Sequence, residues 1–421
     1  MAMTLPLMAA ITRGSAARPV TTTRFLALLL PMAMTMYGAF QGAQFVLLPI
    51  QLQNVDPAGK VFDLAAIVVA CAITGALGMA TGGWATDFTR TRWGGRAPWL
   101  FGMGVVSVAL FAAIGFQSQV VAIGILASVF WFTLNFFQGA MLTTLSGRTQ
   151  PHDRAFAAAL FAVAGPMGGL YGYNLAAMAG GAAGYVALAA IFLVTLAMYL
   201  MLAPEGASGP ARAAPAQTAE GRPDTMFASF RRRDFLLAFS FRLALFSGQA
   251  TIMNYIVYYM VDRIGLANIP SHSAEIANGQ IASLRTVFTL IGLALGMALV
   301  RRTDRKKIFL QGYALLMAAA MLGPALRADW TMLLFYGAVS GFAWGFYATI
   351  DIGLMNIVLP NPATRGRDLG FLAMTGALGQ LVGPPLASAL IHASGYAALF
   401  EAGALLTLGA GLAAGFMKGV R

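Results

Sequence analysis

Charged residues are scarce in this chain of 421 residues, and that scarcity excludes an ordinary soluble fold. Only 10% of the residues are charged and 59% are hydrophobic, whereas a soluble domain carries about 25% charged residues. Such a composition cannot supply a water-facing surface. A bilayer, in contrast, is an apolar solvent for helices that satisfy their own backbone hydrogen bonds. We therefore predict an all-α membrane protein.

Cysteine and histidine are scarce too. The single cysteine, Cys71, lies in an apolar run, which excludes a disulfide framework and a thiolate metal site. His152, His272 and His392 are far apart and share no ligand spacing. The sequence has no phosphate-binding Gly-Lys-Ser loop and no nucleophile elbow. We expect no cofactor, no bound metal and no enzymatic activity.

Basic residues outnumber acidic ones and give a net charge of +12. A nucleic-acid partner would require these residues to cluster on one folded face. Here they fall between apolar runs, so we expect no nucleic-acid partner. Short cytoplasmic loops carry the excess of Lys and Arg in membrane proteins, and with the N-terminus inside only Lys60, Arg263 and Arg327 fall in outside loops. This predicts a multi-pass protein of the plasma (inner) membrane with both termini in the cytoplasm.

Twelve apolar runs are long enough to cross the hydrocarbon core, which takes about 20 residues. They predict two halves, 25–203 and 234–417, joined by a flexible linker at 204–233 that is rich in Ala, Gly, Pro and charge. Residues 1–24 and 418–421 are expected to be cytoplasmic tails. The expected spans are 25–50, 62–83, 98–117, 120–144, 155–177, 182–203, 235–261, 279–300, 308–326, 330–357, 368–391 and 395–417.

The two halves resemble each other in sequence. A shift of 213 residues places Trp131 on Trp344, Gln138 on Asp351 and Arg154 on Arg367. This match predicts duplicated six-helix halves with pseudo-symmetry. Many secondary transporters are built from such repeats and bind their substrate near the membrane midplane between the halves.

The loop between the second and third spans carries a recognisable pattern. Gly83 is followed four residues later by Asp87, and Arg90, Arg92 and Arg96 come before a Pro-Trp pair. The pattern resembles the signature loop of the major facilitator superfamily. Its longer form, Thr-Arg-Thr-Arg-Trp-Gly, resembles the loop of the glycoside, pentoside and hexuronide symporters and the sucrose-type carriers. The resemblance implies that Asp87 latches the two halves together, and we expect Gly83 to permit close helix packing.

This loop departs from the family pattern in two places. Phe88 and Ala97 replace basic residues that are usual there, which predicts a weaker latch. Asp304 stands in the corresponding loop after span eight. Asp304 and Asp87 also fit an ordinary positive-inside loop.

Span five contains Gly165-Pro166-Met-Gly168-Gly169. This element resembles the Gly-Pro-x-Gly-Gly segment of drug and proton antiporters and keeps export open as an alternative. A bent helix without any role in export explains the element equally well, because proline bends helices and glycine permits close packing.

The superfamily resemblance implies that spans one, four, seven and ten line a central cavity. Each of these spans has a polar stripe at helical spacing. Amides and aromatic rings suit a hydroxylated solute, although interhelical hydrogen bonding would also explain the stripes. The stripes contain Tyr37, Gln41 and Gln44; Trp131, Asn135 and Gln138; Arg242 and Gln249; and Trp344, Tyr347 and Asp351.

Two arginines lie inside spans, where a charge costs about 2.5 to 3.5 kcal/mol and therefore indicates function. Arg242 lies eight residues after Asp234, and Asp351 eight residues before Leu359. Both positions are about 12 Å from the cytoplasmic ends of their spans, so we hypothesise an ion pair. Arg285 lies about six residues into span eight from the outside. It is expected either to meet an anionic substrate group or to snorkel outward.

The coupling ion is not fixed by the sequence. Cation-coupled sugar carriers keep carboxylates within span two, where this chain has only Asp63 at the outer edge. Asp351 is the candidate for H⁺ coupling, Asp63 and Glu401 are poorer ones, and facilitated diffusion stays open. We expect a monomeric, lipid-embedded secondary transporter of a small, sugar-like organic solute. The alternatives are a proton-driven drug or metabolite efflux antiporter and a non-transporting receptor or assembly factor.

Overall fold

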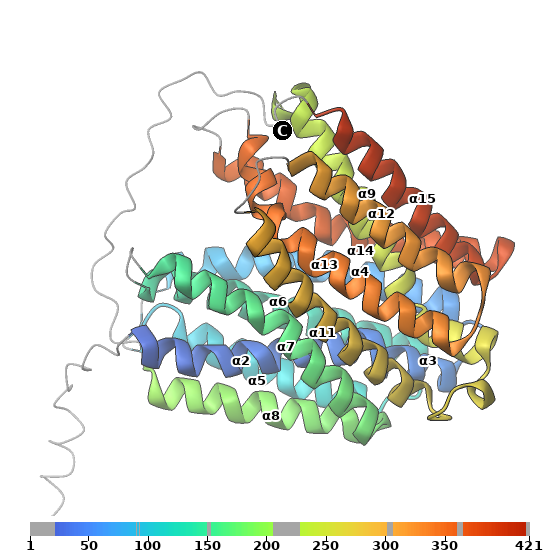
Figure 1. Cartoon of the computed structure of the whole chain (residues 1–421). Helices are drawn as coiled ribbons and strands as arrows, with labels where there is room; N and C mark the ends of the chain where they lie inside the picture. The colour runs from blue at the N-terminus through green and yellow to red at the C-terminus, as the bar shows by residue number, and fades with distance from the viewer. Residues whose placement is uncertain are drawn as a thin grey trace, which may run out of the picture.

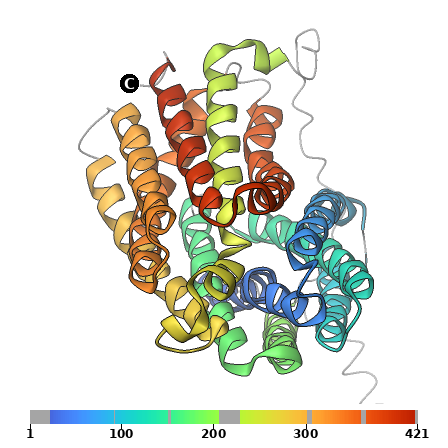
Figure 2. The ribbon, with the colours of Figure 1, turned by 90° about the vertical axis from the view of Figure 1, so that its right-hand side faces the viewer.

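The computed structural model describes residues 22–89, 91, 93–149, 153–204, 228–300, 306–359 and 365–417. These residues form helices and short connections, with no strand in the described ranges. Figures 1 and 2 show two neighbouring helical bundles, one blue to green and the other yellow to red. The prediction of an all-α fold is confirmed.

The N-terminal bundle holds the first six expected spans. Its first span is interrupted by a π-helical segment, η1, but continues in the same direction as α3. The elements are α2 (Thr22–Gly42), η1 (Ala43–Leu47), α3 (Leu48–Val55), α4 (Lys60–Phe88), α5 (Ala97–Ile114), α6 (Val120–Arg148), α7 (Arg154–Ala179) and α8 (Gly181–Leu202).

The C-terminal bundle repeats this order. A short 3₁₀ helix, η2 (Ala228–Arg231), leads into it, and its first span is again interrupted, at the end of α9. The elements are α9 (Arg233–Met253), α10 (Ile256–Tyr258), π-helical η3 (Tyr259–Ile264), η4 (Leu266–Asn268), α11 (Ala274–Val300), α12 (Lys306–Leu326), α13 (Trp330–Ile357), α14 (Arg365–Ser394) and α15 (Ala397–Gly415). Most of the expected linker, at 205–227, lies outside the described residues, as do the two expected tails except for residues 22–24.

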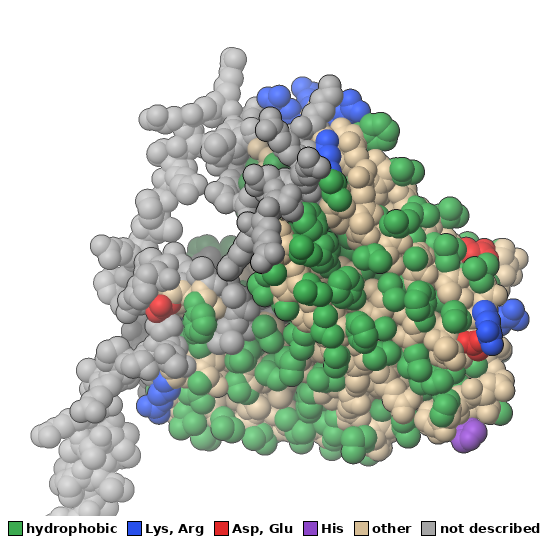
Figure 3. Space-filling model, in the orientation of Figure 1, with side chains coloured by type: hydrophobic (Ala, Val, Ile, Leu, Met, Phe, Trp, Pro, Cys, Tyr) green, Lys and Arg blue, Asp and Glu red, His purple; other side chains and the backbone are tan. Residues whose placement is uncertain are grey.

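Within the described residues, eleven helices are long and apolar enough to span a membrane. Helix α7 is not among them, but it has 26 residues and packs between α2 and α11. With α7, the helices fill the twelve expected spans. Figure 3 shows hydrophobic side chains over most of the face in view and charged side chains near its edges, which fits a surface in contact with lipid.

Glycines allow the helices of each bundle to approach closely. A Cβ atom on Gly78 of α4 would lie 2.1 Å from the carbonyl oxygen of Phe132 in α6. A Cβ on Gly345 of α13 would lie 1.9 Å from the carbonyl oxygen of Thr289 in α11. The second and fourth spans of each bundle therefore pack through glycine in the same way, as the internal repeat requires.

Candidate functional site

The two bundles are joined at the end of the molecule where α4 and α13 begin, which we call the outer end. There the Lys60 Nζ atom lies 2.7 Å from Asp262 Oδ2, and the Lys60 side chain is only 8% exposed. The hydroxyl of Tyr258 donates to the carbonyl oxygen of Pro49 (3.0 Å), and the hydroxyl of Tyr255 donates to that of Val61 (3.0 Å). These contacts close the outer end; in Figure 1 it lies at the right, where α3 is labelled.

A cluster of three amides joins the bundles deeper in the molecule. Gln44 Nε2 donates to Asn254 Oδ1 (3.0 Å) and to Gln380 Oε1 (3.2 Å). Asn254 Nδ2 also donates to Gln380 Oε1 (3.2 Å). Gln44 and Asn254 are buried, so each amide satisfies polar atoms of the others in place of water. The cluster forms the boundary between the closed outer end and a cavity.

A cavity of about 730 Å³ lies between the bundles, with Gln44 and Gln380 in its wall. It extends along α14 to Gly370, which lies near the start of that helix and far from the outer end of the molecule. The amide and aromatic side chains in its wall are Phe40, Gln44, Trp131, Asn135, Gln138 and Gln380. The structure thus brings together four of the residues expected in the stripes of spans one and four.

The polar stripes also bind neighbouring helices. Gln138 Nε2 donates to the hydroxyl of Tyr37 in α2 (2.9 Å), and Gln41 Nε2 donates to the carbonyl oxygen of Gly165 in α7 (2.9 Å). Asn135 Nδ2, in contrast, donates to the carbonyl oxygen of Trp131 in its own helix, α6 (2.8 Å). The two explanations of the stripes therefore apply together, because a residue such as Gln138 both lines the cavity and holds a neighbouring helix.

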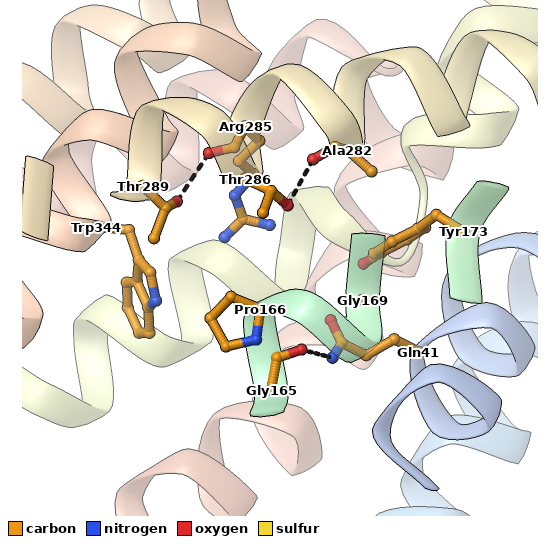
Figure 4. Close-up of a pocket in the computed structure, with 10 residues that line it drawn as sticks. All are labelled: Gln41, Gly165, Pro166, Gly169, Tyr173, Ala282, Arg285, Thr286, Thr289 and Trp344. Carbon is orange, nitrogen blue, oxygen red and sulfur yellow. Dashed lines mark hydrogen bonds between the residues drawn. The ribbon is translucent and has the colours of Figure 1, made fainter. Parts of the chain in front are cut away.

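A second, smaller cavity of about 220 Å³ lies between α2 and α7 of one bundle and α11 and α13 of the other. Figure 4 shows its ten lining residues. Gln41, Gly165, Pro166, Gly169 and Tyr173 come from the N-terminal bundle; Ala282, Arg285, Thr286, Thr289 and Trp344 come from the C-terminal bundle. The glycine-proline element of span five is therefore part of this wall.

Arg285 faces this cavity and not the lipid. Helix α11 begins at Ala274, so Arg285 lies about 16 Å into the helix at 1.5 Å per residue. The sequence predicted a depth of about six residues, or about 9 Å. Arg285 lies deeper because α11 begins before the apolar run does. Its Nη1 donates to Met253 Sδ (3.0 Å), and no salt bridge to a carboxylate is found for it in the described part of the chain.

Arg242 and Asp351 form the hypothesised ion pair. Arg242 is 4% exposed, and its Nε also donates to the carbonyl oxygen of Leu372 (3.1 Å) and to Thr375 Oγ1 (3.2 Å). The hydroxyl of Tyr347 donates to the same carboxylate. The pair thereby connects α9, α13 and α14, and the charge of Arg242 is compensated inside the C-terminal bundle.

Some of the expected site residues lie elsewhere. Gln249 is half-buried and lines neither cavity. Helix α6 does approach Gly83, since a Cβ on Gly139 would lie 2.9 Å from the Gly83 backbone nitrogen, but a Cβ on Gly83 itself would meet nothing within 4 Å. The position in α4 that needs glycine is Gly82, where a Cβ would lie 2.2 Å from the carbonyl oxygen of Phe136.

Most residues of the expected latch lie outside the described part of the chain. Arg90, Arg92 and Asp304, together with the side chain of Asp87, lie outside the described residues. Arg96 stands at the start of α5, where its carbonyl oxygen accepts from the backbone nitrogen of Leu100 (3.0 Å). Sequence reasoning missed Gln380, because span eleven was not among the expected cavity helices. Its only sequence signal is an amide within an apolar run.

Comparisons with known proteins agree with the fold. The family model described as Major Facilitator Superfamily matches residues 268–420. No curated protein sequence matches the chain. The nucleoside transporter NupG has 14% identity and a TM-score of 0.73, with 94% of this chain and 100% of that chain covered. The peptide transporter POT, solved with sulfate, has 13% identity and a TM-score of 0.72, with 92% of each chain covered.

A third solved structure is a bacterial homologue of the human lysosomal transporter Spinster, in an inward-facing, unoccupied conformation. It has 13% identity and a TM-score of 0.62, with 94% of each chain covered. At such low identity these likenesses describe the fold alone. The chain therefore has the fold of major facilitator superfamily transporters, and its C-terminal part matches the sequence model of that superfamily.

Proposed function

We propose that this chain is a secondary transporter that moves a small polar organic solute across the membrane by alternating access. The observation that carries the proposal is the cavity of about 730 Å³ between two pseudo-symmetric bundles that are closed at the outer end. A solute bound between two bundles can pass from one side to the other when the bundles rock against each other around it. With the termini in the cytoplasm, as we propose, closure of the outer end supports an inward-facing state.

The wall of this cavity favours a hydroxylated solute. Ligand sites usually have volumes of about 300 to 1,000 Å³, and the cavity falls within that range. Asn135, Gln138 and Gln380 offer amide donors and acceptors, and Trp131 and Phe40 offer ring faces. The resemblance of the second loop to sugar carriers supports the same class, so we propose a sugar-like solute.

We propose H⁺ as the coupling ion, with Asp351 as its acceptor. The carboxylate is held by Arg242 and Tyr347 and is 18% exposed, so a proton can reach it only by weakening the ion pair. Protonation would release Arg242, which is also bound to α14 through Leu372. A proton could thereby change how the helices of the C-terminal bundle pack.

Proton-driven export is the second candidate. The observation that favours it is the position of Gly165 and Pro166 in the wall of the smaller cavity, because this segment resembles an element of antiporters. Import and export use the same two bundles, and they differ in the direction in which a proton gradient drives the solute.

Counterflow in proteoliposomes tests the proposed function. The purified protein is first screened by thermal unfolding against sugars, glycosides, organic acids and drugs, and each stabilising compound is then tested for exchange and for its response to an imposed pH gradient. Asn135→Ala should weaken both stabilisation and exchange. Gln311→Ala, an exposed amide of α12, is the matched control and should change neither.

Three results would count against the proposal. Absence of exchange for every compound that stabilises the protein would contradict transport and favour a receptor. Exchange of hydrophobic cations or drugs alone would replace the sugar-like solute by an export substrate. Exchange that ignores the pH gradient, or that keeps its pH response in Asp351→Asn, would contradict H⁺ coupling at Asp351.

A further inference from the structure

The smaller cavity contains a positive charge that no carboxylate of the described residues pairs with. Arg285 lies in a membrane-spanning helix, and its guanidinium contacts Met253 Sδ (3.0 Å), a weak and neutral acceptor. No carboxylate of the described residues forms a salt bridge with it. Arg242, the other arginine inside a span, has Asp351 as its partner. A cation within a span is expensive unless it is paired or reaches water, so the half-buried Arg285 depends on the contents of the cavity, either water or an anion.

Two further hydrogen-bond donors face the same space. The hydroxyl of Tyr173 points into the cavity from α7, and in Figure 4 the indole nitrogen of Trp344 lies on the side of its ring nearest to Arg285. No hydrogen bond of the described residues uses either donor, although both residues line the cavity. A guanidinium, an indole N–H and a phenol O–H together make a donor set for an anion.

The hydroxyls in the cavity wall do not compete for the guanidinium. Thr286 Oγ1 donates to the carbonyl oxygen of Ala282 (2.9 Å), and Thr289 Oγ1 donates to that of Arg285 (2.8 Å). Figure 4 shows both bonds running along α11. These side chains satisfy their own helix and leave the centre of the cavity to the three donors.

We propose that this cavity binds the carboxylate of a small organic anion, held by Arg285. The inference rests on the proposed transport function and refines its substrate to an acidic solute, such as a sugar acid. The planar guanidinium matches a carboxylate with two parallel hydrogen bonds. The cavity of about 220 Å³ has room for the acidic group and a short stem, since a water molecule occupies about 30 Å³.

The cavity lies between the two bundles, so a bound carboxylate would contact both of them. Arg285 and Trp344 belong to the C-terminal bundle, whereas Tyr173 and Gln41 belong to the N-terminal bundle. An anion bound by Arg285 and by Tyr173 would connect the two. Because Gln41 in this wall and Gln44 in the wall of the larger cavity follow each other along the first span, the rest of the solute can extend toward the larger cavity.

Matched acids and neutral analogues test this subsite on the purified full chain. The pairs are sodium gluconate with glucose, sodium lactate with lactamide, and sodium benzoate with benzamide, at constant ionic strength. At least one acid should raise the thermal midpoint of the wild-type protein more than its neutral partner does. In Arg285→Gln the affinity for that acid should fall about 10- to 100-fold, the worth of a charge-assisted hydrogen bond; Arg285→Lys should retain part of it.

Arg327→Gln is the control for a general effect of charge, because Arg327 is 77% exposed and paired with Asp329. It should bind the acid like the wild type. A second measurement needs no ligand: Arg285→Met should leave the thermal midpoint of the free protein unchanged or raise it, since an unbalanced charge is removed. A clear fall would mean that Arg285 is a structural residue and would overturn the proposal.

The outcomes separate this inference from the proposed function. Equal stabilisation by every acid and its neutral partner overturns the anion subsite. If neutral solutes are nevertheless exchanged in proteoliposomes, the transport function stands. If an acid binds through Arg285 but is not exchanged, the subsite stands and the transport function falls.

Discussion

The Arg242–Asp351 ion pair allows the most direct test of the interior of the C-terminal bundle. Arg242 is 4% exposed and Asp351 18%, so removing either partner leaves the other charge in a medium of low dielectric. Breaking a buried pair in this way costs about 3 to 5 kcal/mol. The stability lost in Asp351→Asn should be near the lower limit of this range, because Arg242 keeps its hydrogen bonds to Leu372 (3.1 Å) and Thr375 (3.2 Å).

A double-mutant cycle isolates the interaction between the two charges. Arg242→Gln and Asp351→Asn are compared with the double variant by denaturant titration of the purified protein in detergent. The double variant should lose less stability than the sum of the two single losses, by about 1 to 3 kcal/mol, as expected for residues in contact. Reversing both charges should likewise preserve more transport activity than reversing either one.

The result that would refute this reasoning is additivity. If the two single losses sum to the loss of the double variant within about 0.5 kcal/mol, the side chains do not interact energetically. If the double reversal is as inactive as the worse single reversal, transport does not depend on the attraction between Arg242 and Asp351. H⁺ coupling at Asp351 would then lose its physical basis too.

Three further predictions concern packing and access. Gly345→Val should abolish folded protein on size-exclusion chromatography, because its Cβ would lie 1.9 Å from a carbonyl oxygen of α11; Gly312→Val, whose Cβ meets nothing within 4 Å, should fold normally. The single cysteine, Cys71, is 3% exposed in the cavity wall and should react with maleimide far more slowly in the native protein than after unfolding in SDS. Lys60→Gln removes the pair with Asp262 at the outer end and should speed labelling of Cys71 by an impermeant maleimide added outside; an unchanged rate would show that this pair does not hold the outer end closed.

The two arginines inside spans differ in a way that bears on function. Arg242 is paired with a carboxylate and bonded to a neighbouring helix, so it stabilises the bundle that contains it. Arg285 has only a thioether as its partner among the described residues. A charge within a span that no described carboxylate pairs with is costly, and a ligand explains its presence more easily than packing does.

The sequence alone determined the features that depend on local composition and periodicity. Apolar runs of about 20 residues, long enough to cross the hydrocarbon core, favour helices, because a helix satisfies its backbone hydrogen bonds within one segment. The all-α fold follows from that rule. The polar stripes follow from the period of 3.6 residues, which shows that Trp131, Asn135 and Gln138 share one face of a helix.

Only the tertiary structure decided what lies opposite each face. Periodicity fixes the direction of a side chain but not its neighbour, so the meeting of Gln44 with Gln380 and the use of Gln138 to bind Tyr37 required the packed helices. The depth of Arg285 depended on where α11 begins, and a hydropathy run does not mark that point. The position that cannot accept a Cβ is Gly82 and not Gly83, since one residue turns the side-chain direction by about 100° around the helix axis.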